Sequence, residues 1–147
     1  MVEHMRQSRK SGKSVVRGAG VVAAGAALLV GVTGGTAHAA VGWNAQYTAG
    51  DIGGAHAWGS VDAQSRVFVK VNIKDSKPGD AYGARVYLKA RYNDGGTRAE
   101  NLSVSGGSKS TTWTFAANVV KIQVQECTTK GGSTYKCASG WHTLPRG

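Results

Sequence analysis

The clearest alternation of hydrophobic and polar positions lies near the C-terminus, in residues 119–127. Val120, Ile122 and Val124 are apolar, and the residues between them are polar. A period of two is typical of a strand that is buried on one face. We therefore expect these three side chains to face a core and their neighbours to face water, with the rest of the chain built against this strand.

A turn and a short return strand follow. Residues 128–133 contain the pair Gly131-Gly132, and residues 134–137 return along the first strand. Cys127 and Cys137 stand on either side of the turn, so a hairpin would place them face to face. The sequence therefore predicts a β-hairpin closed by a disulfide between these two cysteines.

The same alternation recurs upstream, clearly in residues 66–75 and 81–92, between turn signals such as Pro78-Gly79 and the run Asn-Asp-Gly-Gly at 93–96. Trp113 and Phe115 share one face of their segment and are expected in the core. The remaining expected strands are 55–60, 66–75, 81–92, 97–105, 110–115 and 141–144. This order predicts an all-β fold, a small antiparallel β-sandwich of six or seven strands, with a barrel as the alternative.

Residues 1–39 have a different composition. A basic segment (1–17) precedes a small, apolar segment (18–32), and Ala37-His38-Ala39 follows as a small-x-small cleavage pattern. This is the order of a secretory signal peptide, and the apolar part is short of the roughly 20 residues that span a membrane. We expect a signal peptide at 1–39, an extended N-terminal arm at 40–54, a sandwich domain at 55–147, and a secreted, extracellular protein in which the two cysteines pair.

Removal of the signal changes how the charge is interpreted. The full chain has 18 Lys and Arg against 8 Asp and Glu, a net charge of +10, and cleavage leaves 13 against 7, a net charge of +6. The remaining cations are scattered over polar strand positions. Solubility, or attraction to an anionic cell wall or an acidic partner, explains them as well as nucleic acid does. We expect no nucleic-acid binding and no membrane association after cleavage.

Catalytic patterns are weak. His56 and His142 are the histidines left after cleavage, no Gly-x-Ser-x-Gly elbow is present, and scattered carboxylates with two paired cysteines do not suggest a metal site. Glu100 and Glu126 are expected on solvent faces, where they would not form a catalytic pair. The sequence therefore predicts no catalytic residue, no metal ligand and no cofactor, and the protein is expected not to be an enzyme.

Aromatic residues outside the well-patterned strands suggest recognition. Trp43 and Tyr47 lie in the glycine-rich arm, and exposed aromatic side chains are common interface anchors. We expect a partner-binding set of Trp43, Asn44, Tyr47 and Ile52, and we expect Trp43→Ala to weaken a partner without lowering stability. Trp58 and Trp141 fit equally well as plugs at the ends of the core.

The layout resembles the small secreted one-disulfide β-sandwich proteins of actinobacteria, through the leader, the cysteine hairpin and the ending Cys-Ala-Ser-Gly-Trp-His-Thr at 137–143. Among these it looks like the small linker subunit of umbrella toxin particles. That resemblance implies a non-catalytic adaptor whose N-terminal arm inserts into a lectin-like subunit, while its sheet is engaged by a toxin-bearing subunit.

Three alternatives stay open. A cell-wall or polysaccharide carbohydrate-binding module would need a flat row of exposed Trp and Tyr on one sheet. A secreted protease inhibitor would need a rigid protruding loop, for which residues 128–133 are the natural candidate. A small secreted toxin would inhibit neighbouring cells by itself.

Overall fold

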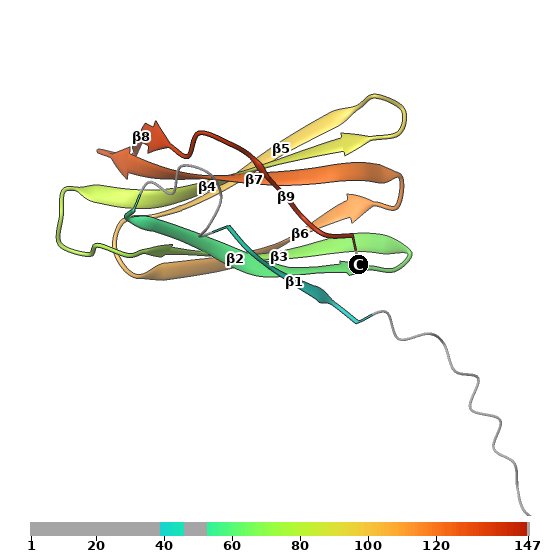
Figure 1. Cartoon of the computed structure of the whole chain (residues 1–147), viewed down its shortest axis with the longest axis horizontal. Coiled ribbons are helices and arrows are strands. Elements are labelled where there is room, and N and C mark those ends of the chain that lie inside the picture. Colours follow the sequence, from blue (N-terminus) through green and yellow to red (C-terminus); the bar gives the residue numbers. More distant parts are fainter. Residues whose placement is uncertain (1–38, 46–52, 147) are drawn as a thin grey trace, which may run out of the picture. The chain divides into compact units, whose positions relative to one another are not determined.

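The computed structural model describes residues 39–45 and 53–146, and these form nine strands in antiparallel pairs. Figure 1 shows them as two layers. The strands are β1 (Val41–Asn44), β2 (Ala55–Ala63), β3 (Arg66–Asp75), β4 (Tyr82–Tyr92), β5 (Thr97–Val104), β6 (Ser108–Ala116), β7 (Val119–Lys130), β8 (Ser133–Cys137) and β9 (His142–Thr143).

One layer, sheet A, has the strand order β1-β2-β3-β6, and the other, sheet B, has the order β5-β4-β7-β8, with β9 also paired to β7. The prediction of an all-β antiparallel sandwich is confirmed. The described residues contain nine strands rather than six or seven. They include no helix of the length and hydropathy that crossing a bilayer requires.

The core lies between the sheets and follows the alternation in the sequence. Side chains at alternate positions of β3 and β4 are buried in the core, while the residues between them face outward and are polar except for Phe68. Phe115 is fully buried, as expected, whereas Trp113 packs only partly against the core. The buried set on the two central strands is Val67, Val69, Val71, Ile73, Ala84, Val86, Leu88 and Ala90.

The predicted hairpin is confirmed and is tighter than expected. Strand β7 continues to Lys130, so the turn consists of Gly131 and Gly132, with φ of 57° and 81°. Positive φ at both turn residues is the conformation that joins two twisted strands in two residues, and glycine adopts it without a steric penalty. Cys127 pairs directly with Cys137 across the ladder, and the disulfide forms between them.

The expected extended arm is wrong for residues 41–44. These residues form β1, which pairs with β2 in sheet A and brings Trp43 opposite Gly59. The Trp43 side chain is 6% exposed and belongs to the core. A Cβ at residue 59 would collide with the backbone carbonyl of Lys70 on β3 and would lie 3.1 Å from the indole, so only glycine fits between that backbone and the ring.

Candidate binding surfaces

Sheet A ends in two edge strands, the four-residue β1 and β6, a nine-residue strand that pairs only with β3 among the described residues. The amide of Asp75 donates to Gly107 O at 2.9 Å, one position beyond the pair Lys74–Ser108. Asp75 and Gly107 are therefore a hydrogen-bonded pair. Because bonded and non-bonded pairs alternate along an antiparallel ladder, the odd-numbered residues of β6 bond to β3. The even-numbered residues turn their N–H and C=O groups away from β3. Ser110 and Thr112 therefore present backbone donors and acceptors at an exposed sheet margin.

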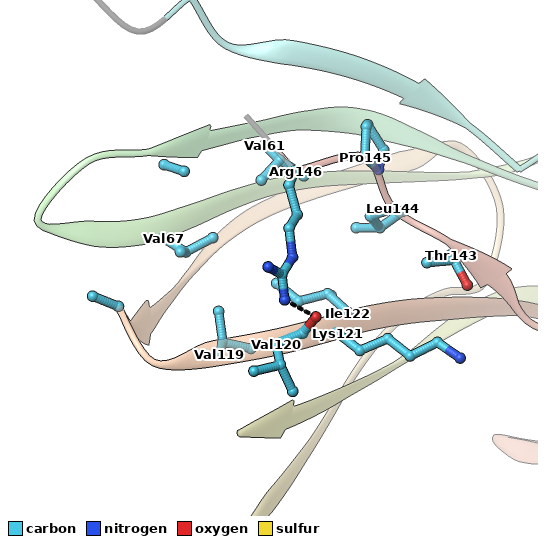
Figure 2. A pocket seen from close by; sticks show the side chains of 12 residues that line it. Val61, Val67, Val119, Val120, Lys121, Ile122, Thr143, Leu144, Pro145 and Arg146 are labelled. Carbon is cyan, nitrogen blue, oxygen red and sulfur yellow. Dashed lines mark hydrogen bonds between the residues drawn. The ribbon is translucent and has the colours of Figure 1, made fainter. Parts of the chain in front are cut away.

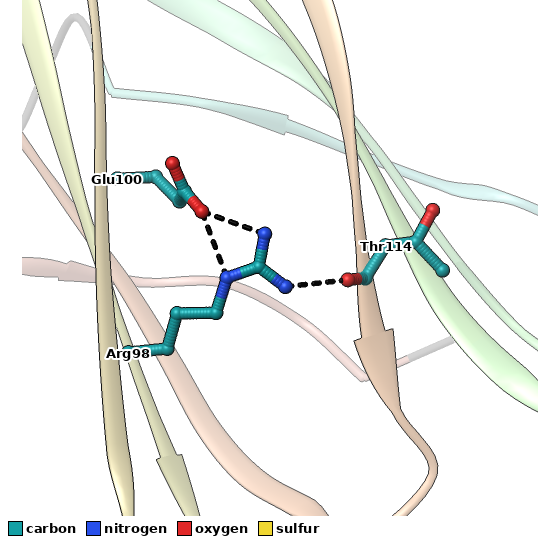
Figure 3. Close-up of polar contacts among 3 residues, drawn as sticks. All are labelled: Arg98, Glu100 and Thr114. Atoms are coloured by element: carbon teal, nitrogen blue, oxygen red, sulfur yellow. Dashed lines mark hydrogen bonds and ion pairs between the residues drawn. The ribbon is translucent and has the colours of Figure 1, made fainter.

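The neighbouring edge, β5 of sheet B, is protected by charged side chains that point inward. Arg98 and Glu100 form an ion pair with 2.6 Å between Nη2 and Oε1, and Arg98 Nη1 donates to Thr114 O of β6 at 2.8 Å (Figure 3). The guanidinium also lies 4.9 Å from the centre of the Phe115 ring. The hydrogen bond to Glu100 raises the pKa of Arg98. Inward charges on an edge strand discourage the addition of a further strand.

The outer face of sheet B carries three cations close together. Lys89 and Arg91 are two residues apart on β4, and Lys121 of β7 lies directly opposite Arg91. All three are exposed. Among the residues that the structure describes, none of the three forms an ion pair, and no acidic residue occupies a strand position on this face. We call Lys89, Arg91 and Lys121 the cationic triad.

A fourth cation on the same face, Arg85, has a structural role. Its guanidinium donates to Tyr87 Oη and Thr134 Oγ1, both at 3.1 Å, and to Gly132 O at 2.8 Å, which ties β4 to the β7–β8 turn. The Tyr87 hydroxyl lies 2.6 Å from Thr134 Oγ1. The hydrogen bonds to Thr134 and Arg85 lower the pKa of Tyr87.

The exposed aromatic side chains are divided among several surfaces. The most exposed is Tyr135 of β8, at 60%, which contacts Tyr82 of β4 with 4.9 Å between ring centres. Trp58, tilted against His56 with 4.7 Å between ring centres, and Phe68 share the outer face of sheet A. Tyr87 lies on the outer face of sheet B, and Trp141 precedes β9. The described residues therefore do not form the flat row of Trp and Tyr on one sheet that a carbohydrate-binding module was expected to need.

An apolar pocket of about 410 Å³ opens between the sheets at the end that holds the β2–β3 and β6–β7 turns. Val61, Val67, Ile122 and Leu144 line it, and the guanidinium of Arg146 reaches the backbone oxygen of Val120 (Figure 2). No histidine, cysteine or carboxylate is among its lining residues. Its apolar walls belong to the hydrophobic core, which assigns this pocket to a packing gap at the end of the sandwich.

The expectation that Glu126 faces solvent is wrong. The side chain is 0% exposed, on the inner face of β7, and its Oε1 accepts a hydrogen bond from Ala57 N at 2.5 Å. The carboxylate thus joins the two sheets near the end of β1. The signal was present in the sequence, because Glu126 continues the inward positions Ile122 and Val124. Glu100 is also directed inward, and its carboxylate is paired with Arg98.

Those residues singled out from the sequence that the structure describes are not gathered into one site. Asn44 ends β1, with its Oδ1 3.0 Å from His56 Nε2, while Trp43 is in the core. Tyr47 and Ile52 lie outside the described residues. His56 is on sheet A and His142 on sheet B. Within ranges 39–45 and 53–146 no three His, Cys, Asp or Glu side chains form a group that could hold a metal ion.

Comparison of the chain with protein-family models gives no match, and comparison with curated proteins gives none. A functional assignment therefore depends on the surfaces of the fold.

Proposed function

We propose that this protein is an exported, non-catalytic adaptor that docks a larger secreted protein by accepting an extended strand at the free edge of β6. The single observation that carries the proposal is the outward direction of the backbone groups at Ser110 and Thr112. Strand addition at an open sheet edge uses such groups for affinity. The leader-like composition of residues 1–39 and the Cys127–Cys137 disulfide support export to an oxidising compartment.

The contrast between the two neighbouring edges gives the proposal its specificity. Strand β6 is regular over nine residues and lacks proline, whereas the β5 edge carries the inward pair Arg98 and Glu100. On β6 itself, Arg98 takes the outward carbonyl of Thr114, and Lys109 stands at the inward position opposite Ile73, so the open stretch is residues 110–112. Folded proteins protect sheet edges against unwanted pairing, so this open stretch beside a protected edge indicates a docking strand. The likeness to the linker subunit of umbrella toxin particles makes lectin-like and toxin-bearing subunits the first partners to seek.

The test uses proline at matched positions on the two edges. Thr112→Pro removes an N–H that points away from β3, so the ladder inside sheet A keeps its hydrogen bonds. Asn101→Pro is the control on β5. The hydrogen bond from Tyr92 N to Gly96 O makes that pair a bonded one, so by the same alternation Tyr87 and Asn101 are a non-bonded pair. The Asn101 amide therefore points away from β4, as the Thr112 amide points away from β3. Tagged full-length protein is recovered from culture supernatant under gentle conditions, and associated proteins are identified by mass spectrometry.

We expect Thr112→Pro to lose its partner and Asn101→Pro to retain it. Recovery of monomer alone from the unsubstituted protein would contradict the adaptor function. So would a partner that Thr112→Pro still binds. Retention on chitin, cellulose or peptidoglycan would indicate a carbohydrate-binding module instead, and inhibition of a protease that is lost on cleavage within residues 128–133 would indicate an inhibitor.

A further inference from the structure

We infer that the cationic triad on the outer face of sheet B binds a linear phosphate-bearing polymer of a cell surface, namely a chain with one phosphodiester per polyol repeat. This site is separate from the β6 edge and does not depend on the proposed adaptor function.

The first observation is an unfavourable charge arrangement. Arg91 and Lys121 are direct cross-strand partners, and Lys89 is the neighbouring cation on the same face. Like charges directly opposite each other on a sheet are destabilising. The described residues include no acidic strand position on this face to offset the repulsion. Folding alone does not explain three such cations, whereas an anion lying across them would remove the repulsion.

The second observation concerns the class of anion. The neighbours of the triad on adjacent strands are small or polar, Thr97 opposite Arg91 and both Ala99 and Gln123 opposite Lys89. A protein interface usually includes a buried aromatic or apolar anchor. None stands at the strand positions beside the triad on this face, and the apolar pocket that Lys121 also lines opens between the sheets. The occupant should therefore be hydrophilic along its whole length, with its affinity supplied by charge.

Nucleic acid meets the charge requirement but fits the surroundings less well. Proteins that bind single-stranded nucleic acid add aromatic platforms on which bases stack. The aromatic ring on this face, Tyr87, is held by Thr134 and lies under the Arg85 guanidinium, 5.7 Å from its centre. A polyol-phosphate chain needs no stacking platform. Arginine and lysine both bind phosphate, the former through a planar fork.

The test measures binding of a synthetic oligo(glycerol phosphate) to the full chain by calorimetry over a series of salt concentrations. If three cations each contact phosphate, log K should fall with log salt with a slope of about −2, by analogy with single-stranded nucleic acid. The double variant Arg91→Gln/Lys121→Gln should bind on the order of tenfold more weakly and show a slope nearer −0.7.

Lys70→Gln/Lys74→Gln is the matched control, because it removes two exposed cations from the outer face of sheet A. It should leave binding almost unchanged. The thermal midpoint of the free triad variant should not fall, since the substitution relieves repulsion. A single-stranded DNA oligomer with the same number of phosphates should bind more weakly than the polyol phosphate.

Four outcomes would overturn the inference. They are absence of binding at low salt, equal losses in the triad and control variants, tighter binding of the DNA oligomer, and a lowered thermal midpoint of the triad variant. Each can occur whether or not the Thr112→Pro experiment succeeds, so failure at this face is distinguishable from failure at the β6 edge.

Discussion

The two sheets bury similar apolar faces and differ in how they present their polar groups. Sheet A has an outer face rich in Ser and Thr along β6 and an open margin at that strand. Sheet B has a protected β5 edge, a disulfide between β7 and β8, and three uncompensated cations on its outer face. One sheet offers backbone hydrogen bonds and the other offers charge, which suggests two contacts of different chemistry on one scaffold.

The stabilising features are divided in the same way. Sheet A is completed at its other margin by β1, whose Trp43 fills the core, whereas sheet B is completed by a covalent bond between Cys127 and Cys137. Glu126 links the two through Ala57. Substitutions in these features can therefore be compared on a common scale of unfolding free energy.

The largest expected effect is in sheet A. Trp43→Ala should lower the free energy of unfolding by about 3 kcal/mol or more, because it removes a buried indole from the core. Urea denaturation measures the change. Trp43→Phe is the control and should cost much less, since it keeps an aromatic ring and removes an indole N–H that has no hydrogen-bond partner within the described residues. If Trp43→Ala lowers the free energy of unfolding by less than about 1 kcal/mol, the Trp43 side chain is not part of the core, and the sequence prediction of an exposed interface residue holds.

The corresponding change in sheet B is removal of the disulfide. Cys127 and Cys137 are separated by 10 residues, and closing a loop of this size contributes about 3 kcal/mol in the chain-entropy account. Cys127→Ser/Cys137→Ser should therefore unfold at a lower urea concentration, to an extent that rivals Trp43→Ala. A reduced sample of the unsubstituted protein is the control. If neither loses stability, the β7–β8 turn holds the hairpin without the covalent bond.

The link between the sheets should have an intermediate effect. Glu126→Ala leaves the buried N–H of Ala57 without its acceptor, which costs about 1–3 kcal/mol. Glu100→Ala is the matched control, because it breaks a partly exposed ion pair with Arg98 that is worth at most about 1 kcal/mol. Equal losses in the two variants, measured by urea denaturation, would show that the Glu126 contact contributes no more than a surface pair.

The smallest expected effect depends on pH and belongs to sheet B. Hydrogen bonds from Thr134 and Arg85 lower the pKa of Tyr87 below its ordinary value, so the folded protein ionises this phenol before the unfolded chain does. The resulting stabilisation is present above the unfolded pKa and is lost as pH falls through the folded one. Ultraviolet titration should show an early tyrosine ionisation that disappears in Tyr87→Phe and moves to higher pH in Thr134→Val. An unchanged titration in Tyr87→Phe would contradict this assignment.

The sequence by itself determined the fold class, the central strands and the cysteine hairpin. Each of these is local: the alternation in residues 66–75 and 81–92 sets one buried face per strand, and Gly131-Gly132 sets the turn that brings Cys127 opposite Cys137. A period of two fixes which side chains share a face. The same period groups Glu126 with Ile122 and Val124, but its charge led to the wrong prediction of a solvent-facing position.

Only the tertiary structure decided which strands are edges, what covers each of them and which distant residues meet. The weak pattern of residues 41–44 gave no reason to expect β1, because its pairing with β2 and the space beside Gly59 depend on contacts far along the chain. The pairing of Arg91 with Lys121 arises in the same way, from a register between strands 30 residues apart in sequence. Strand order and register are set by packing between sheets, and alternation within one strand carries no information about its neighbour.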